Sequence, residues 1–317
     1  MTRQAALRIG TRASLLARTQ TGWVADELRA RGSIVTIETI RTSGDARGDV
    51  PVPRIGGDGV FVRELEAALL DGRIDAAVHS LKDLPTAATA GLRLACVPRR
   101  ALPFDVLVSR RYPSLETLPH GAVVGTASVR RTLQVRALRP DLEVRSVRGN
   151  VDSRLSRLDA GEYDALVLAG AGLVRLGLEP RITEILRPPA FWPAVGQGAL
   201  VVQTRIEDTP TLETIAPLDD AETHAAVRAE RGFLATLAGG CLAPIGAWAR
   251  WNAAGGLELG GCVLEERDGI VRRIVAEGAA VPEQSPEAFG AAIAGQLRAT
   301  GADEMLAAAR AAAAPRG

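Results

Sequence analysis

The segment from His79 to Asp83 places an imidazole, a hydroxyl, an ammonium and a carboxylate within five consecutive positions. It directly follows an apolar run typical of a buried strand, and α/β proteins bind ligands at the carboxyl ends of such strands. Of the 38 basic residues, Lys82 is the one lysine, which indicates that a compact ammonium is needed there. A capped turn with a surface ion pair remains the alternative interpretation of this segment.

A second candidate site is rich in arginine. Residues 130–157 contain eight arginines, and we expect Arg136, Arg139 and Arg157 to lie on solvated helix faces. Four others of the eight follow strands or begin helices and are expected at the edge of a sheet: Arg130, Arg131, Arg148 and Arg154. Arg12, which follows the first strand of the chain, is expected at the same kind of edge.

Two serines precede predicted helices next to these arginines. Ser14 and Ser128 are good N-caps, and Thr126 stands just before the second of them. Free backbone N–H groups at a helix start attract anions, and guanidinium forks bind carboxylates with two parallel hydrogen bonds. The pattern therefore predicts a site for a small ligand with several carboxylates, although a phosphate or a nucleic-acid backbone would fit the composition nearly as well.

The three cysteines differ in setting. Cys96 and Cys262 lie inside apolar strand-like runs and are expected in the core. Cys241 follows Gly239-Gly240, where the backbone can approach another segment closely, so it is either inert packing or an accessible nucleophile or attachment point. His120 and His224 have no metal-ligand spacing to another histidine or to a cysteine, so we predict no metal site.

Composition excludes several classes of protein. The net charge is +1 and aromatic residues make up 3% of the chain, which argues against a nucleic-acid module. The longest charge-free window, 232–249, contains four glycines and Pro244 and does not resemble a membrane span. Three scattered cysteines are too few for a disulfide framework, so we predict a cytoplasmic protein without a membrane partner.

Short strand-like runs alternate with helix-period segments, which predicts an α/β fold with mainly parallel sheets. The first lobe is expected to contain strands at 7–10, 34–40, 74–78 and 92–97 and helices at 14–30 and 61–70. After Pro98–Pro103 the alternation restarts, with strands at 122–125, 142–147 and 165–169 and helices at 129–138 and 151–159. A valine run within PAVGQGALVVQTR, residues 193–205, is expected to form a strand that returns to one of the lobes.

The pattern changes again after Asp219. A helix over 221–237, antiparallel strands near 245–251, 257–265 and 270–277, and a final helix over 286–314 predict a small α+β domain. We therefore expect residues 1–99 and 198–217 to form lobe 1, 103–195 to form lobe 2, and 220–317 to form domain 3.

Seven segments occur in an order that strongly resembles the porphobilinogen deaminase (hydroxymethylbilane synthase) family: RIGTRASLLA, GGDGVFVRELEAALL, AVHSLKDLPT, GTASVRR, VRGNVDSRL, WPAVGQGAL and GGCLAPIG. The resemblance spans about residues 7 to 300. It implies a transferase of tetrapyrrole (haem) synthesis that joins four porphobilinogen molecules head to tail with loss of ammonia. It also implies two lobes like those of periplasmic binding proteins, with the active site in the cleft between them.

The resemblance also implies a cofactor and its site. A dipyrromethane would be held by a thioether to Cys241, and Asp83 would be the catalytic residue, with hydroxymethylbilane released by hydrolysis. The cofactor-contacting positions would be Lys82, Asp83, Ser14, Thr126, Ser128, Arg130, Arg131 and Arg148. Porphobilinogen and its oligopyrrole intermediates would be bound by Arg12, Arg148, Arg154 and Arg175, in a protein expected to be a monomer.

Two residues depart from the family pattern. Asp58 stands where many members have a lysine in the GGKG loop, and Ala127 stands where many have a serine. Asp58 adds an anion near a polyanionic product, which casts doubt on that loop's contribution to substrate binding. The competing hypothesis is a two-lobed carboxylate-binding protein without catalytic activity, which would need neither a covalent adduct nor Asp83.

Overall fold

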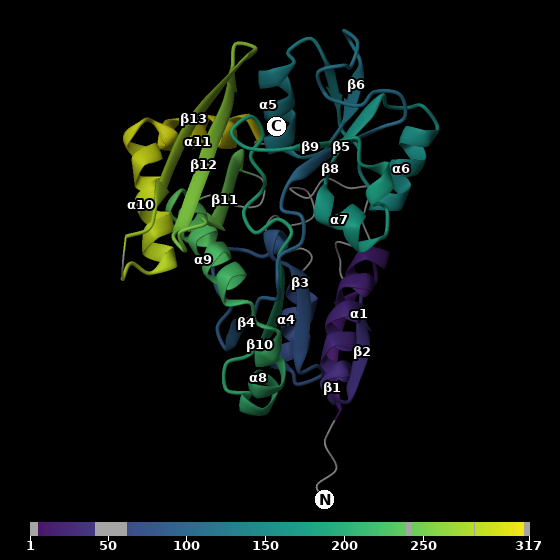
Figure 1. Cartoon of the computed structure of the whole chain (residues 1–317), viewed down its shortest axis with the longest axis vertical. Coiled ribbons are helices and arrows are strands. Elements are labelled where there is room, and N and C mark those ends of the chain that lie inside the picture. Colours follow the sequence, from purple (N-terminus) through teal and green to yellow (C-terminus); the bar gives the residue numbers. More distant parts are fainter. Residues whose placement is uncertain (1–5, 42–61, 239–242, 282, 314–317) are drawn as a thin grey trace, which may run out of the picture. The chain divides into compact units, whose positions relative to one another are not determined.

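The computed structural model describes residues 6–41, 62–238, 243–281 and 283–313. The chain forms two compact units (Figure 1), Met1–Ala101 with Gly198–His224 and Leu102–Gln197 with Ala225–Gly317. The division into three domains stays a prediction. The expected lobe 2 and residues 225–317 of the expected domain 3 fall within the second unit, and residues 220–224 fall within the first. Across the described ranges, no helix has both the length and the apolar character needed to cross a membrane.

The first unit contains a five-stranded sheet of order β2-β1-β3-β10-β4. β1 pairs parallel with both β2 and β3, whereas β10 pairs antiparallel with β3 and β4, so β10 runs opposite to the other strands. This confirms the predicted α/β class and the return of the valine-rich strand. The strands are β1 (Leu7–Arg12), β2 (Val35–Ile40), β3 (Ala76–Ser80), β4 (Leu92–Cys96) and β10 (Leu200–Arg205).

Side chains of the first sheet alternate between two apolar cores. Val78 packs with Leu28 of α1 on one face, while Ala77, the preceding residue, packs with Leu65 and Leu69 of α4 on the other. This alternation follows from the period of two in a strand. The helices of this unit are α1 (Leu15–Ala30), α4 (Arg63–Leu70), η1 (Leu81–Asp83), α8 (Thr209–Ile215) and η3 (Ala216–Leu218).

The second unit contains another five-stranded sheet, of order β7-β6-β8-β5-β9. Here β7, β6 and β8 are parallel neighbours, and β5 runs opposite to β8 and β9. The strands are β5 (Asp105–Ser109), β6 (Val123–Gly125), β7 (Glu143–Arg145), β8 (Ala165–Ala169) and β9 (Glu184–Leu186). Helices α5 (Val129–Leu138), α6 (Val151–Asp159), α7 (Gly170–Arg175) and η2 (Glu179–Arg181) connect them.

A three-stranded antiparallel sheet, β11-β12-β13, also lies in the second unit, as predicted for the small α+β part. Its strands are β11 (Ile245–Trp251), β12 (Leu257–Arg267) and β13 (Ile270–Ala279). Apolar residues of α9 (Ala221–Thr236), α10 (Pro286–Ala299) and α11 (Ala302–Ala313) share one core with this sheet. Figure 1 shows α10 and α11 in yellow beside the green strands.

Some predicted elements were wrong in extent or missing. The final helix is two helices, because Gly301 adopts a φ of +100° between α10 and α11, a left-handed conformation that a helix cannot contain. Strands β5 and β9 were not predicted. β5 begins at Asp105, which is fully buried. A charged residue normally marks the exposed end of an apolar run, so the pattern around Asp105 did not indicate the start of a buried strand.

Trp192 joins the third sheet to the rest of the second unit. Its side chain is fully buried, and a Cβ atom added at Gly260 would lie 2.4 Å from its Cη2 atom. A Cβ atom at Gly246 of the neighbouring strand would lie 2.6 Å from the Trp192 Cβ. Because neither glycine has a side chain, the Trp192 side chain can pack directly against the backbone of both strands.

We expect Gly260→Ala to lower the free energy of unfolding by about 1–3 kcal/mol, because the added methyl group overpacks the Trp192 indole. Gly295 of α10 is the matched control, since nothing lies within 4 Å of a Cβ atom added there. Gly295→Ala should raise stability by up to about 1 kcal/mol through helix propensity. Urea unfolding of both variants tests this, and equal shifts of the same sign would contradict the packing account.

Candidate functional site

In the first unit, the ends of two adjacent parallel strands bring together the first group of candidate residues. Arg12 is the last residue of β1 and Ser80 the last of β3, so both lie at the carboxyl edge of the sheet. Ser14 follows as the N-cap of α1, and its Oγ accepts a hydrogen bond from the Ala17 N–H at 3.3 Å. Ser80 is held by the buried Gln20 of α1, whose Nε2 donates to the serine Oγ at 3.1 Å.

Lys82 and Asp83 lie on the one-turn helix η1 directly after β3. The turn is anchored by the Leu81 N–H, which donates to the Ala199 carbonyl at 3.0 Å, and by the buried side chains of Leu81 and Leu84. The side chains of Lys82 and Asp83 remain half-buried. The fold thus fixes the backbone of this turn and leaves an ammonium and a carboxylate at the sheet edge.

His79 is buried at the end of β3 and is 5% exposed. Burial lowers the pKa of its imidazole to about 4, with a smaller lowering from the nearby Arg12 and an opposing effect of the hydrogen bond with Gln203. The imidazole is therefore neutral near pH 7. This histidine adds no charge to the edge that carries Arg12 and Lys82.

The second unit repeats this arrangement. Thr126 follows β6, and its Oγ1 accepts a hydrogen bond from the Ser128 N–H at 3.3 Å. Ser128 is the N-cap of α5, and its Oγ accepts from the Arg131 N–H at 3.5 Å. A strand end, a hydroxyl and a serine-capped helix therefore meet at the carboxyl edge of each five-stranded sheet.

Three arginines of the second unit crowd positive charge together. The pKa of Arg154 is lowered to about 10, chiefly by burial and to a smaller extent by the nearby charges of Arg131 and Arg148. Its Nε donates to the Gly149 carbonyl at 2.8 Å, which ties it to the loop that carries Arg148. Because guanidinium groups repel one another, carboxylates of a ligand would stabilise this cluster.

Arg175 is placed on another element of the same unit. It ends α7, the short helix that directly follows β8, and its side chain is half-buried. Burial lowers the pKa of its guanidinium to about 10, so the group stays charged near pH 7.

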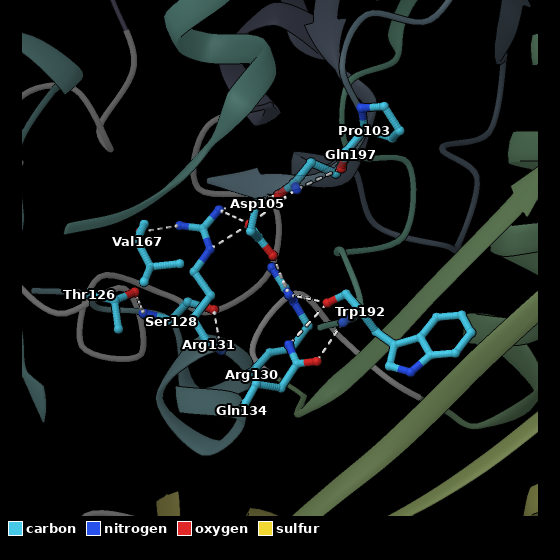
Figure 2. Close-up of polar contacts among 10 residues, drawn as sticks. All are labelled: Pro103, Asp105, Thr126, Ser128, Arg130, Arg131, Gln134, Val167, Trp192 and Gln197. Atoms are coloured by element: carbon cyan, nitrogen blue, oxygen red, sulfur yellow. Dashed lines mark hydrogen bonds and ion pairs between the residues drawn. The ribbon is translucent and has the colours of Figure 1, made fainter. Parts of the chain in front are cut away.

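Arg130 and Arg131 lie in a buried ion cluster with Asp105, which is fully buried (Figure 2). The Arg130 Nη1 lies 2.7 Å from one Asp105 carboxylate oxygen, and the Arg131 Nε lies 2.8 Å from the other. The Arg130 Nη1 also donates to the Trp192 carbonyl, and the Arg131 Nη1 donates to the Val167 carbonyl at 3.3 Å. These two guanidinium groups are therefore part of the core of the unit.

The cluster determines the ionisation of Asp105. Burial alone would raise its pKa, but the charges of Arg130 and Arg131 and their hydrogen bonds outweigh it and lower the pKa to about 2. Sequence reasoning missed this aspartate. The available signal was an acidic residue at the head of the apolar run in LPFDVLV, because aspartate is rarely buried unless it is paired.

Other arginines have structural partners. Arg139 was expected on a solvated face, but its guanidinium donates to the carbonyls of Leu115, Glu116 and Leu118, so that prediction was wrong. Arg136 is partly exposed and forms an ion pair with Glu266 of β12 at 2.6 Å.

The structure decides the setting of two cysteines. Cys96 and Cys262 are fully buried as predicted, and burial raises the pKa of both thiols to about 12. Cys241 and Asp58 lie outside the described residues. Within the described part of the chain, no group of three or more histidine, cysteine, aspartate or glutamate side chains is arranged to hold a metal ion.

Each unit is thus an α/β body that presents cationic side chains and a serine-capped helix at the carboxyl edge of its sheet, an arrangement suited to binding carboxylates. Comparison with protein-family profiles agrees with a carboxylate-binding α/β protein. The profile "Porphobilinogen deaminase, dipyromethane cofactor binding domain" matches residues 7–213, and "Porphobilinogen deaminase, C-terminal domain" matches residues 224–299. The chain therefore belongs to the porphobilinogen deaminase family.

Full-length relatives support the assignment. The porphobilinogen deaminase of Roseiflexus castenholzii is 48% identical over 303 residues, covering 95% of this chain and 98% of its own. That of Maridesulfovibrio salexigens is 46% identical over 302 residues, covering 95% and 97%. The chain is an enzyme of the transferase class, a hydroxymethylbilane synthase of tetrapyrrole biosynthesis, and its cofactor is dipyrromethane.

Among solved structures, a putative methionine-binding lipoprotein from Bacillus subtilis is similar with a TM-score of 0.41 and 14% identity. The match covers 69% of this chain and 92% of that one.

The lowered pKa of His79 makes stability depend on pH. Its folded pKa of about 4 lies below the unfolded value of 6.5, so the unfolded state binds the proton more readily between these values. We expect the free energy of unfolding to fall from pH 8 to pH 5, with about 2 kcal/mol of the loss due to His79. His79→Gln should show a correspondingly smaller loss in urea unfolding at the two pH values. Parallel losses in both proteins would contradict the assignment.

The arginines should separate into two classes on substitution. Arg130→Leu leaves Asp105 buried with one ionic partner fewer, so the free energy of unfolding should fall by about 3–5 kcal/mol. Arg148→Leu should leave stability within about 1 kcal/mol and instead impair porphobilinogen consumption. Arg136→Leu, which removes a partly exposed ion pair, is the control that should change neither by much. Urea unfolding and a turnover assay on the same preparations distinguish the classes.

Proposed function

We propose that this chain joins four porphobilinogen molecules head to tail with loss of ammonia and releases hydroxymethylbilane by hydrolysis. The observation that carries the proposal is the position of the half-buried Arg154 near Arg131 and Arg148: burial first, and then the charges of these two neighbours, lower the pKa of Arg154 to about 10. Every porphobilinogen unit carries an acetate and a propionate, so a growing chain of them brings many carboxylates. A cluster of mutually repelling guanidinium groups is complementary to such a ligand.

Dipyrromethane carries the same acetate and propionate side chains as porphobilinogen, and cationic and hydroxyl side chains like those described above are suited to binding such carboxylates. We assign its contacts to Lys82, Asp83, Ser14, Thr126, Ser128, Arg130, Arg131 and Arg148. Dipyrromethane, when bound, supplies a permanently anchored pyrrole end from which the product chain is extended. Contacts with incoming porphobilinogen and with the oligopyrrole are assigned to Arg12, Arg148, Arg154 and Arg175.

Asp83 is the proposed catalytic residue. Loss of ammonia leaves a cation on the porphobilinogen carbon skeleton, and a nearby carboxylate stabilises positive charge that develops in the transition state. The same carboxylate can exchange a proton with a pyrrole N–H. Anchoring of η1 through the Leu81 N–H supports this role, because a fixed backbone preorganises the Asp83 side chain.

The anchoring thiol is assigned to Cys241. Cys96 and Cys262 are unsuited to this role, because burial raises the pKa of both thiols to about 12 and leaves them protonated. Cys241 follows a pair of glycines near the end of α9 in the sequence. We also propose that the protein acts as a cytoplasmic monomer without nucleic-acid or membrane partners, in line with its net charge of +1 and few aromatic residues.

A pair of variants tests anchoring and catalysis separately. Cys241→Ser should fold but carry no pyrrole mass and have little activity, since the serine hydroxyl cannot form the thioether. Asp83→Asn, supplied with preassembled tetrapyrrole, should carry the dipyrromethane mass yet lose about a hundred- to a thousandfold in turnover. The measurements are intact mass and steady-state porphobilinogen consumption on the same preparations.

Cys96→Ser is the control for the first variant and should keep the adduct. Retention of the pyrrole mass by Cys241→Ser would refute the anchor assignment. Near-normal turnover of a loaded Asp83→Asn enzyme would remove Asp83 from catalysis. A wild-type protein of bare-chain mass that binds carboxylates but never consumes porphobilinogen would favour the alternative, a non-catalytic carboxylate-binding protein.

A further inference from the structure

A buried carboxylate on α9 organises the segment before β10 in the second unit. Glu230 is fully buried. One of its oxygens accepts a hydrogen bond from the Gly196 N–H at 2.6 Å, and the other accepts from the Ala249 N–H of β11 at 2.9 Å. Because a charged acceptor makes strong hydrogen bonds in a buried setting, Glu230 fixes the backbone on the N-terminal side of Gln197.

Gln197 continues this chain of contacts to the arginine cluster (Figure 2). Its side chain is fully buried, and its Nε2 donates to the Pro103 carbonyl at 2.8 Å and to Asp105 Oδ1 at 3.1 Å. Its Oε1 accepts a hydrogen bond from the Arg131 Nη2 at 3.2 Å. One amide therefore contacts both the carboxylate and a guanidinium of the ion cluster.

These contacts restrict the Arg131 guanidinium from three sides. Asp105 accepts from its Nε, the Val167 carbonyl accepts from its Nη1, and Gln197 accepts from its Nη2. A planar group held at all three nitrogens has little freedom left to lose. A ligand carboxylate that meets such a group avoids the entropic cost of ordering a long side chain, so it binds more tightly.

We infer that Gln197, and Glu230 through Gly196, are positioning residues that orient Arg131 for the carboxylates of dipyrromethane. The inference rests on the proposed function, because Arg131 is assigned there to the cofactor. Glu230 acts on the cluster through the backbone of residues 196–197, because it accepts a hydrogen bond from the Gly196 N–H and thereby fixes the residue that precedes Gln197.

Gln134 provides a matched control within the same unit. It is also a fully buried glutamine, and it exchanges two hydrogen bonds with the backbone of Trp192, at 2.6 and 3.0 Å. Figure 2 shows both of these hydrogen bonds between Gln134 and Trp192. Gln134→Leu therefore removes two buried hydrogen bonds of the same unit, and both are hydrogen bonds to the Trp192 backbone.

The experiment titrates full-length apoproteins with hydroxymethylbilane and measures cofactor loading by intact mass. For Gln197→Leu we expect the half-loading concentration to rise about tenfold while saturating hydroxymethylbilane still loads the whole sample. Gln134→Leu should lower the urea midpoint but leave the half-loading concentration within about twofold. Glu230→Gln should raise the half-loading concentration in the same direction by a smaller factor, and this isosteric variant decides the question if Gln197→Leu does not fold.

A double-mutant comparison tests whether the effect passes through Arg131. In an Arg131→Lys background, Gln197→Leu should raise the half-loading concentration by less than about twofold, because the guanidinium that it orients is gone. A full tenfold rise in that background would overturn the inference. So would a wild-type half-loading concentration in Gln197→Leu, or a reduced loaded fraction at unchanged half-loading concentration. Failure of the wild-type apoprotein to gain any pyrrole mass would instead overturn the proposed function.

Discussion

The second unit is organised around one buried carboxylate. Asp105 sits at the first position of a strand that runs against its neighbours, so it lies beside the carboxyl end of β8 and near the start of α5. An isolated charge there would be prohibitively costly, and two arginines at the start of α5 compensate it. The position of α5, of the Trp192 segment and of Gln197 follows from satisfying this one group.

Opposite strand directions have the same consequence in both sheets. In each, one reversed strand places its first residues at the carboxyl edge of the parallel strands: Leu200 pairs with Ser80, and Asp105 pairs with Ala169. The Ala199 carbonyl then anchors the turn of Lys82 and Asp83, and Asp105 anchors Arg130 and Arg131. Backbone and carboxylate acceptors from reversed strands thus hold the cationic side chains of both candidate sites.

The arginines of this chain do not form one class. Asp105 neutralises part of the charge of Arg130 and Arg131. Burial lowers the pKa values of Arg154 and Arg175, and the charges of Arg131 and Arg148 add to the lowering at Arg154. Buried ion pairs hold the elements of the unit together, whereas guanidinium groups close to one another repel and are stabilised when anions bind. A ligand rich in carboxylates supplies such anions, which agrees with a family that binds dipyrromethane.

The sequence by itself determined the α/β class, the strand ends that carry Arg12, Asp83 and Thr126, and the serine caps, because periodicity and capping are local properties of a few residues. It also determined the family, through motifs that occur in order. Only the tertiary structure decided that Asp105 is buried between Arg130 and Arg131 and that Gln197 contacts both partners of that cluster. These contacts join residues 25 to 92 positions apart, and no local pattern specifies which distant charge will compensate a buried one.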